Sequence, residues 1–105
     1  MASSDGALAN EAQLSNEMTR GTQARELLEH DLMREAFEVI EAKAIKEWKS
    51  SENLEGREKC HLMLKALEQL KGHLSEVMLT GRLASLQLEA RRSRVQKMKE
   101  WISDY

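Results

Sequence analysis

The chain has 105 residues, enough for one domain, and it contains no proline, five glycines and four aromatic residues. β-Sandwiches and barrels need many β-branched and aromatic residues, and α/β nucleotide-binding folds need apolar strands joined by glycine-rich turns. The composition excludes both classes. It predicts an all-α fold, because the abundant Ala, Leu, Glu, Lys, Arg, Gln and Met residues lose little on entering a helix.

The compartment is inferred from one cysteine and from the start of the chain. Cys60 is the only cysteine, so no intramolecular disulfide can form, and residues 1–10 lack the basic start and apolar run of a secretion signal. The longest apolar runs are triplets, whereas about 20 residues are needed to cross a bilayer. We therefore expect a soluble protein in a reducing intracellular compartment, with no membrane partner.

Residues 1–20 are small and polar, with few sizeable apolar side chains. Such a segment buries too little surface to offset the entropy of ordering it. The sequence therefore predicts a mobile polar N-terminal arm over residues 1–20. A first helical turn is expected after Gly21, with Thr22 as its N-cap.

Residues 21–81 are predicted to form an antiparallel helical hairpin. His30 or Asp31 can cap a helix whose apolar stripe contains Met33, Phe37, Ile40, Ala44 and Trp48. The polar run Ser50–Asn53 ends that helix, and Asn53 is the expected N-cap of the next. A connection this short makes the two helices antiparallel neighbours.

From Cys60 onward the apolar residues follow a heptad without a slip in register. The a positions are Cys60, Leu67, Leu74, Gly81, Leu88, Val95 and Ile102, and the d positions are Met63, Leu70, Val77, Ala84, Arg91, Met98 and Tyr105. This pattern predicts a long, coiled-coil-like second helix with a basic helical extension over residues 82–105. Two alternatives stay open at Gly81: the helix continues through it, or Gly81 closes the helix as a C′ residue.

The second helix is expected to outrun the first, which leaves its end without an intrachain partner. An uncovered apolar seam must be buried in another subunit or another protein, so the sequence predicts a homo-oligomer. The residues expected at the oligomer or partner interface are Met33, Phe37, Ile40, Trp48, Leu67, Leu70, Leu74, Val77, Leu88, Val95, Met98 and Ile102.

Charge is segregated along the chain. Residues 1–49 carry six basic and ten acidic groups, a net −4, whereas residues 82–105 carry six basic and three acidic groups, a net +3. The polyanion-binding candidates are Arg91, Arg92, Arg94, Lys97 and Lys99. Alternatively, these residues complement the helix macrodipole, or the basic tail contacts the acidic body of a neighbouring subunit.

No catalytic constellation is evident, and we expect a protein that is not an enzyme and that has no cofactor and no small-molecule substrate. Glu58 and His61 have the Glu-x-x-His spacing of ferritin-like metal sites, but the heptad places both on the solvated face. Cys60 lies at an a position and is expected to be a small core residue rather than a nucleophile.

Between Leu27 and Ala84 the sequence resembles a group of small helical proteins encoded by tailed bacteriophages. The matching segments are 27–30, 35–37, Trp48, 55–59, 64–70, 73–74 and 80–84. The resemblance implies a protein of the head-assembly and packaging region, present in the bacterial host cytoplasm and the virion, with other phage structural proteins as partners.

Three functional hypotheses follow. The first is a non-enzymatic phage structural or morphogenesis protein, such as a scaffold-like, portal-associated or internal virion component, which self-associates and docks on other virion proteins. The second is a DNA-binding packaging subunit that uses the basic C-terminal helix. The third is a ferritin-like metal-binding half-bundle.

Overall fold

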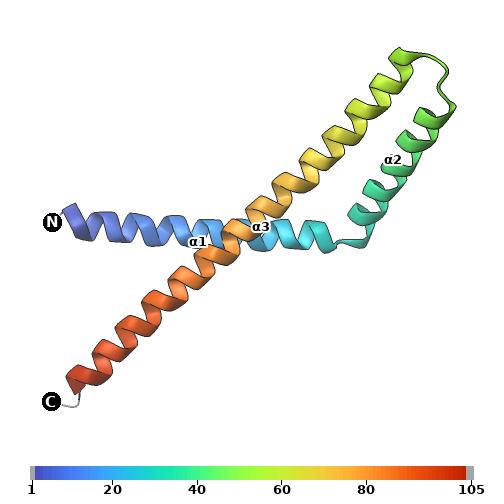
Figure 1. Ribbon diagram of the computed structural model, residues 1–105. Coiled ribbons are helices and arrows are strands. Elements are labelled where there is room, and N and C mark those ends of the chain that lie inside the picture. The colour runs from blue at the N-terminus through green and yellow to red at the C-terminus, as the bar shows by residue number, and fades with distance from the viewer. Residues whose placement is uncertain (1, 104–105) are drawn as a thin grey trace. The chain divides into compact units, whose positions relative to one another are not determined.

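The computed structural model describes residues 2–103, and the side chains of residues 10–103, as three helices (Figure 1). These are α1 (Ala2–Glu29), α2 (Asp31–Ser50) and α3 (Leu54–Ser103). No strand occurs within residues 2–103. The predicted all-α class, with a helical hairpin whose second helix is long, is confirmed.

The helices pack as two compact units. The crossing unit consists of the described residues up to Gln23 together with those from Val77 onward, and the hairpin unit consists of residues 24–76. α1 and α3 each contribute to both units, while α2 lies wholly in the hairpin unit. Each unit is described separately below.

His30 is the single residue that separates α1 from α2. Its backbone is extended, with φ −67° and ψ 124°, and its Nδ1 accepts a hydrogen bond of 3.2 Å from the backbone N–H of Leu32. This bond satisfies one of the N–H groups that a helix leaves unpaired at its start. His30 is therefore the N-cap, and Asp31, the alternative, is the first residue of α2.

The turn between α2 and α3 is closed by short polar side chains. Asn53 Oδ1 accepts a hydrogen bond of 2.7 Å from the N–H of Gly56, as predicted for the N-cap of this helix. Ser51 Oγ donates to the carbonyl of Asn53, and Arg57 Nε donates to the carbonyl of Ser51. A Cβ at Gly56 would meet Ser51 Oγ and Asn53 Oδ1, so a larger residue there would have to displace the side chains that close the turn.

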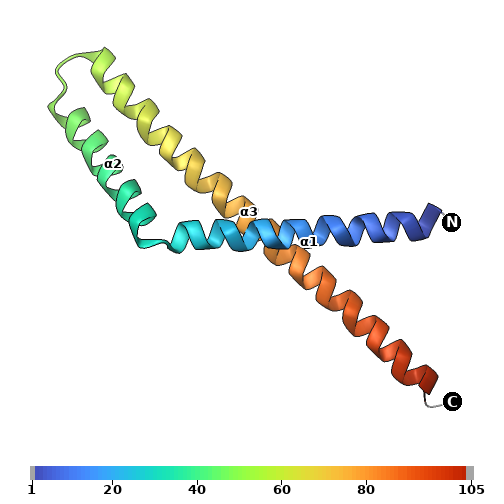
Figure 2. The same cartoon turned by 180° about the vertical axis from the view of Figure 1, so that it is seen from behind.

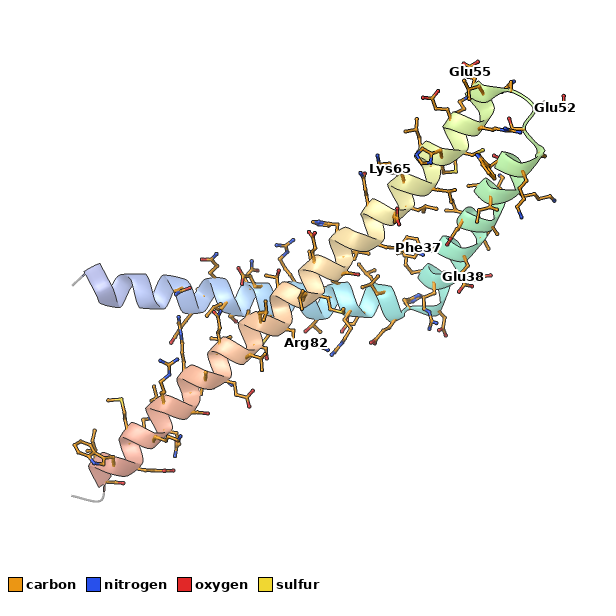
Figure 3. All side chains as sticks on the ribbon, in the orientation of Figure 1. Phe37, Glu38, Glu52, Glu55, Lys65 and Arg82 are labelled. Atoms are coloured by element: carbon orange, nitrogen blue, oxygen red, sulfur yellow. The ribbon has the colours of Figure 1, made fainter. Side chains whose placement is uncertain are left out.

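In the hairpin unit, α2 lies alongside the first part of α3 and runs antiparallel to it (Figures 1 and 2). Phe37, Ala44 and Cys60 are buried, and Phe37 points from α2 towards α3, as Figure 3 shows. Lys71 reaches across the pair: its Nζ lies 5.2 Å from the centre of the Phe37 ring and 3.8 Å from a carboxylate oxygen of Glu41. The core position predicted for Cys60 is confirmed.

α3 continues through Gly81 without a break. It is one helix of 50 residues, and no glycine among the described residues has a positive φ. A C′ residue that closes a helix takes the left-handed conformation, which Gly81 does not. The structure therefore decides between the two alternatives in favour of a continuous helix, which the absence of proline permits.

Instead, α1 crosses α3 within the crossing unit (Figures 1 and 2), and Gly81 lies where the two backbones come close. A Cβ built on Gly81 would lie 2.7 Å from the Cα of Gly21 and 2.8 Å from the carbonyl oxygen of Glu17. In the reciprocal direction, a Cβ on Gly21 would lie 2.7 Å from the Cα of Gly81. The two backbones therefore touch, and only glycine at both positions allows it.

The predictions for the N-terminal segment have different outcomes. The described part of residues 1–20 is helical, because α1 begins at Ala2, and the mobility of this segment stays a prediction. Leu14 is buried in the crossing unit, so contact with α3 supplies the burial that the segment lacks alone. Thr22 is not an N-cap, since it lies inside α1 and its hydroxyl donates to the carbonyl of Met18.

Candidate interaction surfaces

The apolar stripe of α2 is divided between the hairpin core and the surface. Phe37 is buried and Met33 is half-buried, so both are occupied by packing within the hairpin unit. Ile40 and Trp48 remain 41% and 47% exposed. Of the four α2 residues expected at an oligomer interface, only these two keep substantial surface available to a partner.

On α3, the chain covers one edge of the heptad seam. In the hairpin unit the buried or half-buried side chains occupy a and e positions: Cys60, Leu64, Leu67, Lys71 and Leu74. The d residues Met63 and Leu70 are nearly half exposed. The seam is thus covered on one edge by α2, and its d edge is open.

Leu88 was expected to have no intrachain partner, and this expectation is wrong. It is half-buried in the crossing unit, one heptad beyond Gly81. Val77, which lies before Gly81, is half-buried in the same unit. Val95, Met98 and Ile102 lie further along α3 and are each more than half exposed. The crossing of α1 therefore covers the middle of the seam and leaves its end open.

A second apolar surface, which the heptad did not single out, lies on the other side of α3. Leu79, Leu83 and Leu86 are each more than half exposed and follow an i, i+4, i+7 spacing; we call them the leucine patch. Their positions in the heptad are f, c and f, opposite the a positions that face α1. The spacing was visible in the sequence, but it was obscured because the a and d series carried the stronger signal.

The five predicted polyanion-binding residues do not form one cluster. Three of them line a cleft of about 430 Å³ between α1 and α3 in the crossing unit, together with one carboxylate, Glu11. The residues that line this cleft are Glu11, Leu88, Arg91, Arg92, Val95, Gln96 and Lys99. Arg94 and Lys97 are exposed but do not contribute to it.

A smaller hollow of about 290 Å³ lies where α1 meets α2, within the hairpin unit. Its lining is apolar apart from one imidazole: Leu27, His30, Leu32, Met33 and Ala36. Leu32 is 67% exposed, so the hollow opens to solvent. No sequence motif marks this hollow, because it is created by the one-residue break at His30.

The Glu-x-x-His pair lies on the surface. Glu58 and His61 are both exposed, as the heptad register predicted, and Cys60 between them faces the core. Among the described residues, no group of three or more His, Cys, Asp or Glu side chains is arranged to hold a metal ion. The pair is therefore not brought together with further ligands within residues 10–103.

None of the helices, over the residues that the structure describes, is both long enough and apolar enough to span a bilayer. Comparison of the chain with protein-family models, with curated proteins and with solved structures gives no match.

Proposed function

We propose that the protein is a non-enzymatic structural or morphogenesis protein of a tailed bacteriophage, which acts by helical self-association and by docking on other virion proteins. The sequence resemblance over residues 27–84 supports the phage assignment, and with it a location in the host cytoplasm and the virion. A scaffold-like, portal-associated or internal virion role suits a short helical chain with open apolar surfaces.

The leucine patch carries the proposal for self-association. Around Gly81, α3 is apolar on two opposite sides: α1 covers Gly81 and Ala84, whereas Leu79, Leu83 and Leu86 are open to solvent. An exposed apolar patch of this kind normally marks a surface that another protein covers. A second copy offers an identical row of leucines, and two such rows can pack about a twofold axis because the contact is self-complementary.

Light scattering coupled to size-exclusion chromatography, over a range of protein concentrations, tests the proposal. We expect a mass above that of the 12.0 kDa monomer, and we expect Leu83→Asp to shift the protein to the monomer. Leu54→Asp is the matched control: Leu54 is 81% exposed at the start of α3, outside the patch, where a carboxylate suits the helix dipole. The control should associate like the wild type.

A strict monomer at all concentrations would contradict the proposal. If the oligomer persists in Leu83→Asp, the leucine patch is not the contact that holds the copies together. Circular dichroism of each variant separates loss of association from loss of helix.

The exposed basic residues of α3 favour a DNA-binding packaging subunit as a second candidate. Arg92, Arg94, Lys97 and Lys99 are all exposed within eight residues. Such a subunit would bind duplex DNA with an affinity that falls steeply with salt and is lost when Arg91, Arg92 and Arg94 become Ala. The division of these cations between two sides of α3 weakens this candidate, because a single DNA backbone would meet only part of them.

A further inference from the structure

The junction of α1 and α2 combines an apolar hollow with a strongly acidic surround, and we call it the acidic corner (residues 26–38). This segment carries five acidic residues and one basic residue. The five carboxylates are all exposed: Glu26, Glu29, Asp31, Glu35 and Glu38. A hollow of about 290 Å³ lies in the same segment and is lined by none of these carboxylates, so the corner offers an apolar side chain an open site within an acidic stretch of the chain.

The end of α3 has the complementary character, and we call it the basic stripe (residues 91–102). It carries five basic residues, all within residues 91–99, and one acidic residue, Glu100. Val95, Met98 and Ile102 follow an i, i+3, i+7 spacing on one side of the helix and are each more than half exposed. Arg91 and Lys99 lie one helical turn before and after Val95, so cations border the apolar row.

We infer that the basic stripe of one copy docks on the acidic corner of a second copy, with an apolar side chain of the stripe seated in the hollow. The inference rests on the proposed self-association and names a second contact for it. Two basic stripes would repel each other, because each carries five cations. The acidic corner instead carries five exposed carboxylates in the same segment as an open apolar hollow, and opposite charge of this kind selects a partner surface.

This contact differs in symmetry from the one at the leucine patch. It joins two different surfaces, so each copy that uses its stripe still has a free corner, and the contact propagates head to tail. The leucine patch joins identical surfaces and stops at a pair. Used together, the two contacts build an extended assembly from a chain of 105 residues.

Two charge-reversed variants of the full chain test the docking. The stripe variant carries Arg91→Glu, Arg94→Glu and Lys99→Glu, and the corner variant carries Glu29→Lys, Glu35→Lys and Glu38→Lys. A control variant carries Lys46→Glu, Lys59→Glu and Lys65→Glu, which reverses three exposed charges outside both surfaces. Circular dichroism establishes that all three are as helical as the wild type.

Sedimentation velocity then measures assembly size against protein concentration. We expect the wild type and the control to form species larger than a dimer, and the stripe and corner variants to stop at the leucine-patch dimer with a head-to-tail affinity at least about tenfold lower. An equimolar mixture of the two variants should restore the larger species, because each then offers a surface opposite in charge to one on the other. Salt at about 1 M should weaken the wild-type assembly, since it shortens the Debye length to about 3 Å.

The possible failures are distinguishable. If the wild type is monomeric throughout, the proposed self-association itself is wrong. If larger species form but survive both reversals, or the mixture does not restore them, the docking of stripe on corner is overturned while self-association stands. If the wild type stops at a dimer and the stripe variant alone loses salt-dependent binding to duplex DNA, the stripe serves DNA and the inference is also overturned.

Discussion

The two units of this chain pack helices by opposite means. In the hairpin unit, α2 and α3 run side by side and are held apart by large side chains, with Phe37 buried between them. In the crossing unit, α1 and α3 meet at Gly21 and Gly81, where their backbones touch. The first contact is long and depends on apolar volume, whereas the second is short and depends on the absence of side chains.

This difference determines how each unit responds to mutation. Removing volume opens a cavity in the hairpin unit, and adding volume separates the helices of the crossing unit. Truncation of a large side chain therefore tests the hairpin unit, and addition of a methyl group tests the crossing unit.

Phe37→Ala should have the largest effect. Phe37 is 6% exposed and also lies under the Lys71 ammonium group, so truncation loses both apolar burial and a cation–π contact. We expect a loss of about 3 kcal/mol in the free energy of unfolding, measured by urea denaturation. Hydrogen exchange should speed up chiefly in residues 24–76, and faster exchange confined to the crossing unit would contradict the division into units.

Gly81→Ala should destabilise the protein, although helix propensity alone predicts that it stabilises it. Propensity alone predicts a gain of about 1 kcal/mol inside a helix, but a Cβ here would lie 2.7 Å from the Cα of Gly21. We expect a net loss of about 1 to 3 kcal/mol, because the new methyl group meets backbone that cannot rotate away.

Gly72→Ala is the matched control for that change. Gly72 lies in the same helix, and a Cβ there would meet nothing within 4 Å, so this variant should be stabilised by up to about 1 kcal/mol. Thermal denaturation of the two variants side by side decides the matter: two substitutions of the same sign would refute the close crossing.

Asn53→Ala should cost about 1 kcal/mol, because the N–H of Gly56 loses its side-chain acceptor at the start of α3. Asn53→Asp is the control, since a carboxylate accepts the same hydrogen bond and suits the helix dipole. Thermal denaturation followed by circular dichroism measures both. Equal losses in the two variants would show that the cap does not stabilise the turn.

Lys71→Ala should have the smallest effect. The Lys71 Nζ lies 3.8 Å from a carboxylate oxygen of Glu41 and 5.2 Å from the centre of the Phe37 ring. Because the ion pair is about half exposed, we expect each interaction to contribute about 0.5 kcal/mol to the free energy of unfolding. A double-mutant cycle of Lys71→Ala with Glu41→Ala isolates the ionic part. The coupling should fall in high salt, and a salt-independent value would assign the effect to packing.

The hairpin unit was predictable from the sequence because its signals are local and strong. Asn53 caps a helix after a polar run, and large apolar side chains recur on one side of each helix. The crossing unit was not predictable, because Gly21 and Gly81 contribute no apolar periodicity. Their role depends on a meeting of segments 60 residues apart, and residues 10–20 are polar except for Ala12, the buried Leu14 and the half-buried Met18.

The interaction surfaces were predictable in part. The heptad located the apolar end of α3, and the charge count located its basic residues. The heptad did not show which side of α3 the rest of the chain would cover. Positions a and e face α2, whereas the heptad pattern is carried by positions a and d. The leucine patch and the hollow at His30 both needed the arrangement of the helices to be seen.

The burial of Cys60 gives the protein a built-in reporter. Cys60 carries the chain's single thiol and lies on the side of α3 that faces α2. A thiol-specific reagent can reach it only when the hairpin opens, so the rate of modification reports that opening directly. Because the thiol belongs to the natural chain, no reporter residue has to be introduced. A slower rate in the assembled protein would show that assembly keeps the hairpin closed.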